Sequence, residues 1–422
     1  MVKVKLTDSW VACGTEIADL RQVMNEISDC TKGIDVAVDD IQFVTTTKHP
    51  DLENALACIF TGDKNLLSEI APQKRARPKC RGRILRKEEL DSEDFMSLLD
   101  ETLNQTGLFL RDAAHGKWYF VSMNVLSKLS FYGCGGSFMT KPAHELNTKS
   151  TVDRNNFAMA ALMNSGVDKL KFIVRSCNGF SKVFALTSRK YAVIPQDVLL
   201  DIYDQIEKEN LLGKTQCKSW KVDHFFTQIA ITFPEKGEEL RKLYNIPDRR
   251  LVPGLVLETS DTGECSVIIR TGWFIGSSYI LESEVSRKHI GNVDTKKIIE
   301  SVNNVFDRYT RLPERLCELM LINITPTNAD VSTPAGQIAN RKAIDDAVDM
   351  IFRDLSISTA ITKKSDEELR PLVKAQFSDS VSYSAYDVVV QLFSLGEKLP
   401  GLSQMQKKML EKMIGKMPYL KF

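Results

Sequence analysis

The feature that most constrains the fold is a change in hydrophobic period near Asn292. After this residue, apolar side chains recur at helical spacing in several segments up to the end of the chain. Before it, short β-branched and aromatic segments separated by turn residues predict four strands, at residues 227–233, 254–258, 266–271 and 273–281. Because isolated strands leave their edges unpaired, we expect these four to form one antiparallel sheet with the strands that precede them.

Helical and strand-like patterns alternate upstream of this block. Helices are predicted to begin near three residues: Thr15, Asp51 and Ser92. Strands are predicted over two short segments: 41–45 and 118–121. The patterns together predict an α+β fold, with a central antiparallel sheet, helices packed on it and a largely helical C-terminal portion.

Two connections carry good turn signals. Asn178 and Gly179 both tolerate a positive φ, so they predict a hairpin between strands at residues 169–176 and 182–187. Ser260-Asp261-Thr262-Gly263 predicts a second hairpin connection, within the strand-rich block. Both turns therefore favour antiparallel pairing of consecutive strands.

Four segments follow from these patterns in a chain of 422 residues, a length typical of two or three domains. We expect residues 1–70 to be mostly helical. Residues 71–90, interrupted by Pro72 and Pro78, are expected to form a basic arm or linker. Residues 91–292 are expected to form the α+β core, and residues 293–422 the helical C-terminal portion.

Composition limits the cellular setting. No run of about 18 apolar residues is present, so no membrane span is predicted. The first residues lack the apolar block of a secretory signal, and none of the nine cysteines forms a Cys-x-x-Cys pair. We therefore expect free thiols, a reducing compartment and a cytoplasmic location, that of a bacterial host if the protein is phage-derived.

The patterns typical of catalysis and cofactor binding are missing or incomplete. The glycine-rich stretch from Gly133 to Ser137 follows a predicted helix and lacks the lysine of a phosphate-binding loop. Glu282 and Glu284 share a face if their strand continues, but a two-metal site needs further aligned acids, so solvated charges are favoured. We therefore expect no cofactor, no metal and no catalytic residue, and enzymatic activity stays open with a non-catalytic role favoured.

The most concentrated charge is a basic run inside the expected arm. It places eight cations in fourteen residues with no acid among them, although the whole chain has a net charge of +1. A flexible basic segment binds a polynucleotide without reading its sequence, because each neutralised phosphate releases counterions. The basic run consists of Lys74, Arg75, Arg77, Lys79, Arg81, Arg83, Arg86 and Lys87.

A second small basic group, Arg287, Lys288 and His289, follows the strand-rich block and could add phosphate contacts. The alternative interpretation of the basic run is a solvated loop that pairs with acids just downstream. Those acids are Glu88, Glu89, Asp91, Glu93 and Asp94. If they fold back on the run, a polyanion cannot reach it.

Two stretches resemble a known family. One is Arg175-Ser176-Cys177-Asn178-Gly179-Phe180 with its continuation to Pro195; the other runs from Pro253 to Ser266 and is followed by Arg287-Lys288-His289. Their order resembles the phage/plasmid-like proteins of prophages, plasmids and integrative elements, over residues 108–292. At 271–274 this chain has Thr-Gly-Trp-Phe, where that family tends to have a Cys and an Asn-Gly. The resemblance implies a mobile-element origin and assigns no catalytic residue.

The leading hypothesis is therefore a phage or mobile-element protein that binds nucleic acid, single-stranded or duplex, without sequence specificity and without catalysis. Lys74 to Lys87 would contact phosphates, helped by Arg287, Lys288 and His289. The alternative is a protein-interaction or assembly protein, either an inhibitor of a host protein or a self-assembling subunit that forms a homo-oligomer. Neither hypothesis involves a membrane.

Overall fold

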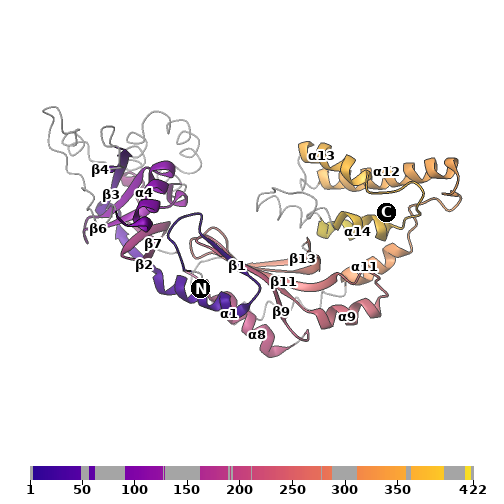
Figure 1. The fold of residues 1–422 in the computed structure, drawn as a ribbon, viewed down its shortest axis with the longest axis horizontal. Helices are drawn as coiled ribbons and strands as arrows, with labels where there is room; N and C mark the ends of the chain where they lie inside the picture. The colour runs from indigo at the N-terminus through magenta and orange to yellow at the C-terminus, as the bar shows by residue number, and fades with distance from the viewer. Residues whose placement is uncertain are drawn as a thin grey trace.

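The computed structural model describes residues 3–48, 57–61, 91–126, 128, 162–188, 191, 193–210, 212–276, 278–287, 311–357, 363–393 and 414–419. Within these residues the chain forms two β-sheets with helices packed against them, so the expected α+β class is confirmed. The four strands predicted between residues 227 and 281 do lie in one antiparallel sheet, whereas the strands predicted before them lie in a second sheet. Figure 1 shows one sheet near the middle of the molecule, with the other sheet and the C-terminal helices toward opposite ends.

The first sheet, called sheet A, is antiparallel throughout and has the strand order β1-β9-β10-β11-β12-β13. Its strands are β1 (Val11–Gly14), β9 (Gln216–Asp223), β10 (Thr227–Thr232), β11 (Leu251–Thr259), β12 (Val267–Ile275) and β13 (Ser278–Arg287). The sequence predicted a break at Gly272, but β12 runs through it. Gly272 instead lies at a register shift opposite β13, where an added Cβ would come 1.9 Å from the Ile280 carbonyl oxygen. The glycine therefore permits a close strand approach and does not end a strand.

The second sheet, called sheet B, has the order β2-β7-β8-β6-β5-β3-β4. Its strands are β2 (Thr31–Ala37), β3 (Ile41–Lys48), β4 (Ala57–Thr61), β5 (Leu108–Asp112), β6 (Lys117–Val121), β7 (Lys169–Cys177) and β8 (Phe180–Ser188). Only the β6–β8 pair is parallel among these strands. The predicted hairpin between β7 and β8 is confirmed, with φ of 53° at Asn178 and 81° at Gly179.

The N-terminal part differs most from expectation. Residues 1–70 were expected to be mostly helical, yet their described residues contain β1 to β4, one α-helix, α1 (Ile17–Cys30), and the short 3-10 helix η1 (Val38–Asp40). The start of the helix expected from Asp51, at residues 51–56, lies outside the described residues, and Ala57–Thr61 form β4, which pairs with β3. Pairing with a neighbouring strand outweighs local helical pattern here, because a short apolar run fits either structure.

Several predicted helices are confirmed. Helix α4 (Glu93–Gln105) begins after Ser92, whose Oγ accepts a hydrogen bond from the Phe95 amide at 3.3 Å, and Gly107 follows it with a φ of 56°. The middle of the chain adds α8 (Val198–Glu209) and α9 (Pro234–Leu243). The C-terminal portion is helical in its described residues, with α11 (Arg311–Met320), α12 (Pro334–Ile357), α13 (Lys363–Lys374), α14 (Ala385–Phe393) and the 3-10 helix η3 (Met417–Tyr419).

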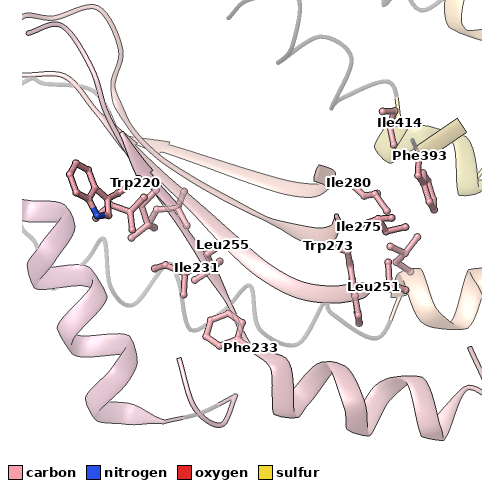
Figure 2. Close-up of a cluster of buried hydrophobic side chains, with 14 of the residues drawn as sticks. Trp220, Ile231, Phe233, Leu251, Leu255, Trp273, Ile275, Ile280, Phe393 and Ile414 are labelled. Atoms are coloured by element: carbon pink, nitrogen blue, oxygen red, sulfur yellow. The ribbon is translucent and has the colours of Figure 1, made fainter. Parts of the chain in front are cut away.

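One face of sheet A carries the largest apolar core. Figure 2 shows Ile231, Leu255 and Trp273 along this face, with Phe393 and Ile414 of the C-terminal portion close to its far end. Helices α1 and α8 bury Leu20, Val23, Leu199 and Ile202 in the same core. Sheet B has a separate core on each face, one of them closed by α4 through Phe95, Leu98 and Leu99. Because α1 packs on sheet A and leads directly into β2, it connects the two sheets.

Candidate functional site at the junction of the two sheets

A fully buried arginine on sheet B binds a carboxylate at the end of sheet A. Arg175 lies near the end of β7, and Asp261 lies in the turn between β11 and β12. Nη2 of Arg175 donates to Asp261 Oδ1 at 2.8 Å and to Oδ2 at 2.7 Å. The side chains are 0% and 4% exposed, so little water screens the pair. This ion pair holds the end of sheet A against sheet B.

The remaining donors of Arg175 are also engaged. Its Nη1 donates to the His224 carbonyl oxygen at 2.6 Å and lies 3.1 Å from His224 Nδ1, while Nε donates to Thr31 Oγ1 at 3.1 Å. With the two bonds to Asp261, each of the three guanidinium nitrogens has an acceptor. Full pairing is what allows a cation to remain charged in the interior.

His224 is held as a neutral imidazole. Its burial, together with the charge of Arg175, lowers its pKa to about 2. Nδ1 faces an Arg175 donor and must accept, so the ring proton resides on Nε2, which lies 2.6 Å from the Lys5 carbonyl oxygen and donates to it. The imidazole thereby links the N-terminal segment to the arginine of sheet B.

A second buried cation stands directly opposite the first. Lys182 of β8 pairs with Arg175 of β7 in the sheet register and is 1% exposed. Its Nζ lies 2.7 Å from Asp8 Oδ1 and also binds the Glu101 carboxylate of α4. Two like charges on adjacent strands repel each other, and the three carboxylates compensate for this repulsion.

An aromatic ring separates these charges from the core. The Phe184 ring centroid lies 5.0 Å from the Arg175 guanidinium carbon, 5.3 Å from Lys182 Nζ and 4.0 Å from the His224 ring centroid. Cations near an aromatic face are attracted to its negative potential. Phe184 therefore packs against Arg175, Lys182 and His224 at once.

The Asp261 carboxylate is positioned by its own turn and by a neighbouring side chain. Ser260 Oγ accepts from the Glu264 amide at 3.1 Å and lies 2.9 Å from Thr262 Oγ1, and Gly263 has a φ of 80°. The predicted hairpin connection at 260–263 is thus confirmed. Gln196 Nε2 donates to Asp261 Oδ1 at 3.0 Å. The turn and Gln196 thus hold the carboxylate in the position in which it binds Arg175.

The two stretches that carried the family resemblance meet at this junction. Arg175 belongs to the first stretch and Asp261 to the second, 86 residues later. Tyr191 of the first stretch also donates to the Asp261 carbonyl oxygen at 3.3 Å, and burial raises the pKa of its phenol. Sequence reasoning noted both stretches but assigned no role to either residue. Arg175, Lys182 and His224 were missed as site residues, because no local spacing indicates contacts between distant strands.

Ten of the eleven residues expected to contact nucleic acid are not among those that the structure describes. Lys74, Arg75, Arg77, Lys79, Arg81, Arg83, Arg86, Lys87, Lys288 and His289 lie outside the described residues. Arg287 is the last residue of β13 and opposes Val267, the first residue of β12. Its backbone therefore lies at the same end of sheet A as the turn that carries Asp261.

Strand β13 continues through Glu282 and Glu284, but a register shift interrupts the regular alternation on which a shared face would depend. The register shift between β12 and β13 leaves Glu282 without a direct partner, whereas Glu284 opposes Arg270. Glu282 accepts a hydrogen bond from the Leu312 amide at the start of α11, and burial raises its pKa to about 8. The two carboxylates thus have different partners, because Glu284 Oε2 lies 3.8 Å from Arg270 Nε. No group of three or more potential metal ligands occurs among the residues that the structure describes.

Comparison with protein-family models, curated proteins and solved structures gives no match to this chain. In the described parts of the chain, no helix combines the length and apolar character needed to cross a bilayer. The class that the fold itself defines is an α+β protein whose two sheets are joined by a buried network of charges.

Proposed function

We propose that the protein binds nucleic acid without sequence specificity through the basic run Lys74 to Lys87, as a phage or mobile-element protein. The observation that carries the proposal is the concentration of eight cations in fourteen residues of a chain with a net charge of +1. Such a segment gains affinity from the release of phosphate counterions and needs no base contacts. The family resemblance of residues 108–292 supports the mobile-element origin.

The segment that carries the basic run lies between β4 and α4 in the chain. The end of β4 and the start of α4 lie at the same end of sheet B. Strand β4, an edge strand, pairs with β3 and ends at Thr61, which lies opposite Val44. By the strand register, β4 runs toward the end of the sheet where Asp112 and Lys117 lie and where the β7–β8 turn is found. Helix α4 begins beside that turn, since Asp94 contacts Asn178. The chain therefore leaves and re-enters sheet B at one end.

In the alternative interpretation, five downstream acids mask the basic run, but one of these acids already has another partner. Asp94 Oδ2 accepts from Asn178 Nδ2 at 2.7 Å, so this acid is engaged by the β7–β8 turn. The helix dipole of α4 also favours negative charge in its first turn, where Glu93 and Asp94 lie. Both acids thus have a structural role in starting α4 that does not depend on the basic run.

In the proposed function, the junction between the sheets has a structural role. Its charged groups are buried and engaged with one another, which fixes sheet B relative to sheet A. A fixed frame lowers the conformational entropy lost when an attached segment binds a ligand. Arg287, whose backbone lies at the same end of sheet A as Asp261, would add a second phosphate contact.

A salt titration tests the proposal directly. Fluorescence anisotropy of labelled single-stranded and duplex oligonucleotides, each with the full chain, gives log Kd against log[salt]. We expect a slope of about 0.7 to 0.9 per phosphate contacted, and the quadruple variant R75A/R77A/R81A/R83A should lower the slope by roughly 3. The matched control is K208A/R249A/K342A/R353A, which removes the same charge from exposed residues elsewhere.

The two variants separate the arm from general surface charge. If the control lowers the slope as much as the arm variant does, the binding depends on net charge and the proposed arm is wrong. If neither polymer binds at low salt, the nucleic-acid function is wrong. Light scattering on the same samples then addresses the alternative, since a large assembly or a stable complex with a host protein in the absence of nucleic acid would favour an interaction protein.

A further inference from the structure

Two cysteines lie next to each other where α1 leads into sheet B. Cys30 is the last residue of α1 and Cys177 is the last residue of β7. The β2–β7 register pairs Thr31, the residue after Cys30, with Arg175, two residues before Cys177, and α1 packs against β7. Because paired strands lie about 5 Å apart, this pairing brings the end of α1 next to the end of β7. Disulfides span Cα distances of about 4.4 to 6.8 Å.

The two thiols contact each other and remain partly accessible. The Cys30 and Cys177 thiols are near enough for each to affect the pKa of the other, and the Cys30 thiol donates a hydrogen bond to the Ile27 carbonyl oxygen at 3.2 Å. Both side chains are half-buried at the margin of the sheet A core. They are therefore close enough to react with each other and open enough to meet a small oxidant.

The charges around the pair make the two thiols unequal. The adjacent Cys177 thiol and the nearby Arg175 guanidinium lower the pKa of Cys30, although burial and Asp261 oppose this. The adjacent Cys30 thiol and burial raise the pKa of Cys177. Cys30 is therefore the more acidic of the two thiols and supplies the thiolate, while Cys177 keeps its proton. This is the asymmetry found in pairs of an attacking and a resolving cysteine.

We propose that Cys30 and Cys177 form a redox-active pair that closes a reversible disulfide when the protein meets a peroxide. The Cys30 thiolate attacks one peroxide oxygen, the O–O bond breaks, and the leaving hydroxide takes up a proton to give water. Sulfur is oxidised to a sulfenic acid and the peroxide is reduced. The Cys177 thiol then attacks this sulfur, forms the S–S bond and releases a second water. A small thiol reverses the reaction by two exchange steps and is itself oxidised to a disulfide.

The disulfide would lie beside the contact that joins the sheets. Thr31, the neighbour of Cys30, accepts from Arg175 Nε, and Arg175 is two residues before Cys177. Oxidation would therefore tie the end of α1, which packs on sheet A, covalently to β7 of sheet B. The pair is independent of the basic run, so it stands whether or not the protein binds nucleic acid.

Peptide mapping of the oxidised full chain tests the pair. The reduced protein is exposed to hydrogen peroxide, remaining thiols are alkylated with iodoacetamide, and peptides are analysed by mass spectrometry before and after dithiothreitol. We expect a peptide that joins Cys30 to Cys177, lighter by two hydrogen atoms and lost on reduction. In C177S, dimedone should trap a sulfenic acid at Cys30, whereas in C30S it should not label Cys177.

Alkylation rates in the protein without substitutions provide a second test, which does not depend on whether the cysteine variants fold. Cys217 is also half-buried, and burial raises its pKa to about 11, so it provides an internal control. At pH 7, iodoacetamide should modify Cys30 more than about 10-fold faster than Cys217, because thiolate is the reactive form. Equal rates, or independent alkylation of Cys30 and Cys177 after peroxide treatment, would overturn the proposal. A disulfide from Cys30 mainly to another cysteine would also overturn it.

Discussion

The variant Asp261→Asn tests how much the ion pair at the junction between the sheets contributes to the free energy of unfolding. The substitution keeps the size of the side chain and removes its charge. The introduced amide can still accept one hydrogen bond from Arg175, while the second bond and the ionic attraction are lost. Arg175 is 0% exposed, so its charge would then lie in the interior without a counterion in contact.

Loss of one partner from a buried ion pair costs about 3 to 5 kcal/mol, because the remaining charge stays desolvated. For a chain of 422 residues, an unfolding entropy of about 2.1 cal/mol/K per residue amounts to about 0.9 kcal/mol/K. The expected decrease in Tm is therefore about 3 to 6 °C if the whole chain melts together, and larger if the junction melts within a smaller cooperative unit.

The assay is thermal and urea unfolding followed by circular dichroism, with Asp248→Asn as the matched control. Asp248 binds Arg250 through two side-chain hydrogen bonds, but that arginine is 60% exposed, so the expected loss is below about 1 kcal/mol. The double variant R175M/D261N should lose less than the sum of the single variants. If D261N unfolds like D248N, the junction does not hold the sheets together.

Three further predictions concern stability. The pKa of His224 is lower in the folded than in the unfolded chain, so stability should fall by about 2 kcal/mol from pH 7 to pH 5, and H224N should show a smaller fall in urea midpoints. The pKa of Glu282 is raised to about 8, so its carboxyl should lower the stability of the folded chain as pH rises from about 4.5 to 8. The variant E282Q should therefore raise Tm more at pH 9 than at pH 5, and equal gains at both pH values would contradict this. Gly272→Ala should destabilise by about 1 to 3 kcal/mol in chemical unfolding because its Cβ would meet a carbonyl oxygen, whereas Gly33→Ala, with its nearest neighbour at 3.5 Å, should be close to neutral.

Elements with local signals could be predicted from the sequence. Ser92 and Gly107 bound α4 because capping depends on residues within one turn of the helix. The Asn178-Gly179 turn likewise depends on two residues that accept a positive φ. The C-terminal helices follow from apolar spacing alone, since each needs only one buried face.

No local sequence pattern indicated that the strands would divide between two sheets. Strand β1 pairs with β9, about 210 residues further along the chain, and β2 pairs with β7, about 140 residues further. Strand β9 was not predicted, although it places Trp220 and Val222 in the sheet A core. Within β12, Gly272 resembled a turn residue, while its actual role is set by the carbonyl of the adjacent strand.

The junction site was only partly foreseeable. The stretches around Arg175 and Asp261 stood out by resemblance, but their contact depends on the fold bringing β7 to the β11–β12 turn. His224 was one of five histidines without a ligand-like spacing, and its place beside Arg175 is a tertiary feature. Buried charges of this kind are identified by their partners, and the partners come from distant parts of the chain.

The position of the first two strands bears on the order in which the protein can fold during synthesis. Among the strands that the structure describes, β1 and β2 are outermost, and their neighbours in the sheets are β9 and β7. As the chain emerges from the ribosome, neither strand has a partner until residues near 177 and 223 have followed. About half of the polypeptide must therefore be made while these edges stay open, a period in which a chaperone or a ligand for exposed strands would have its greatest effect.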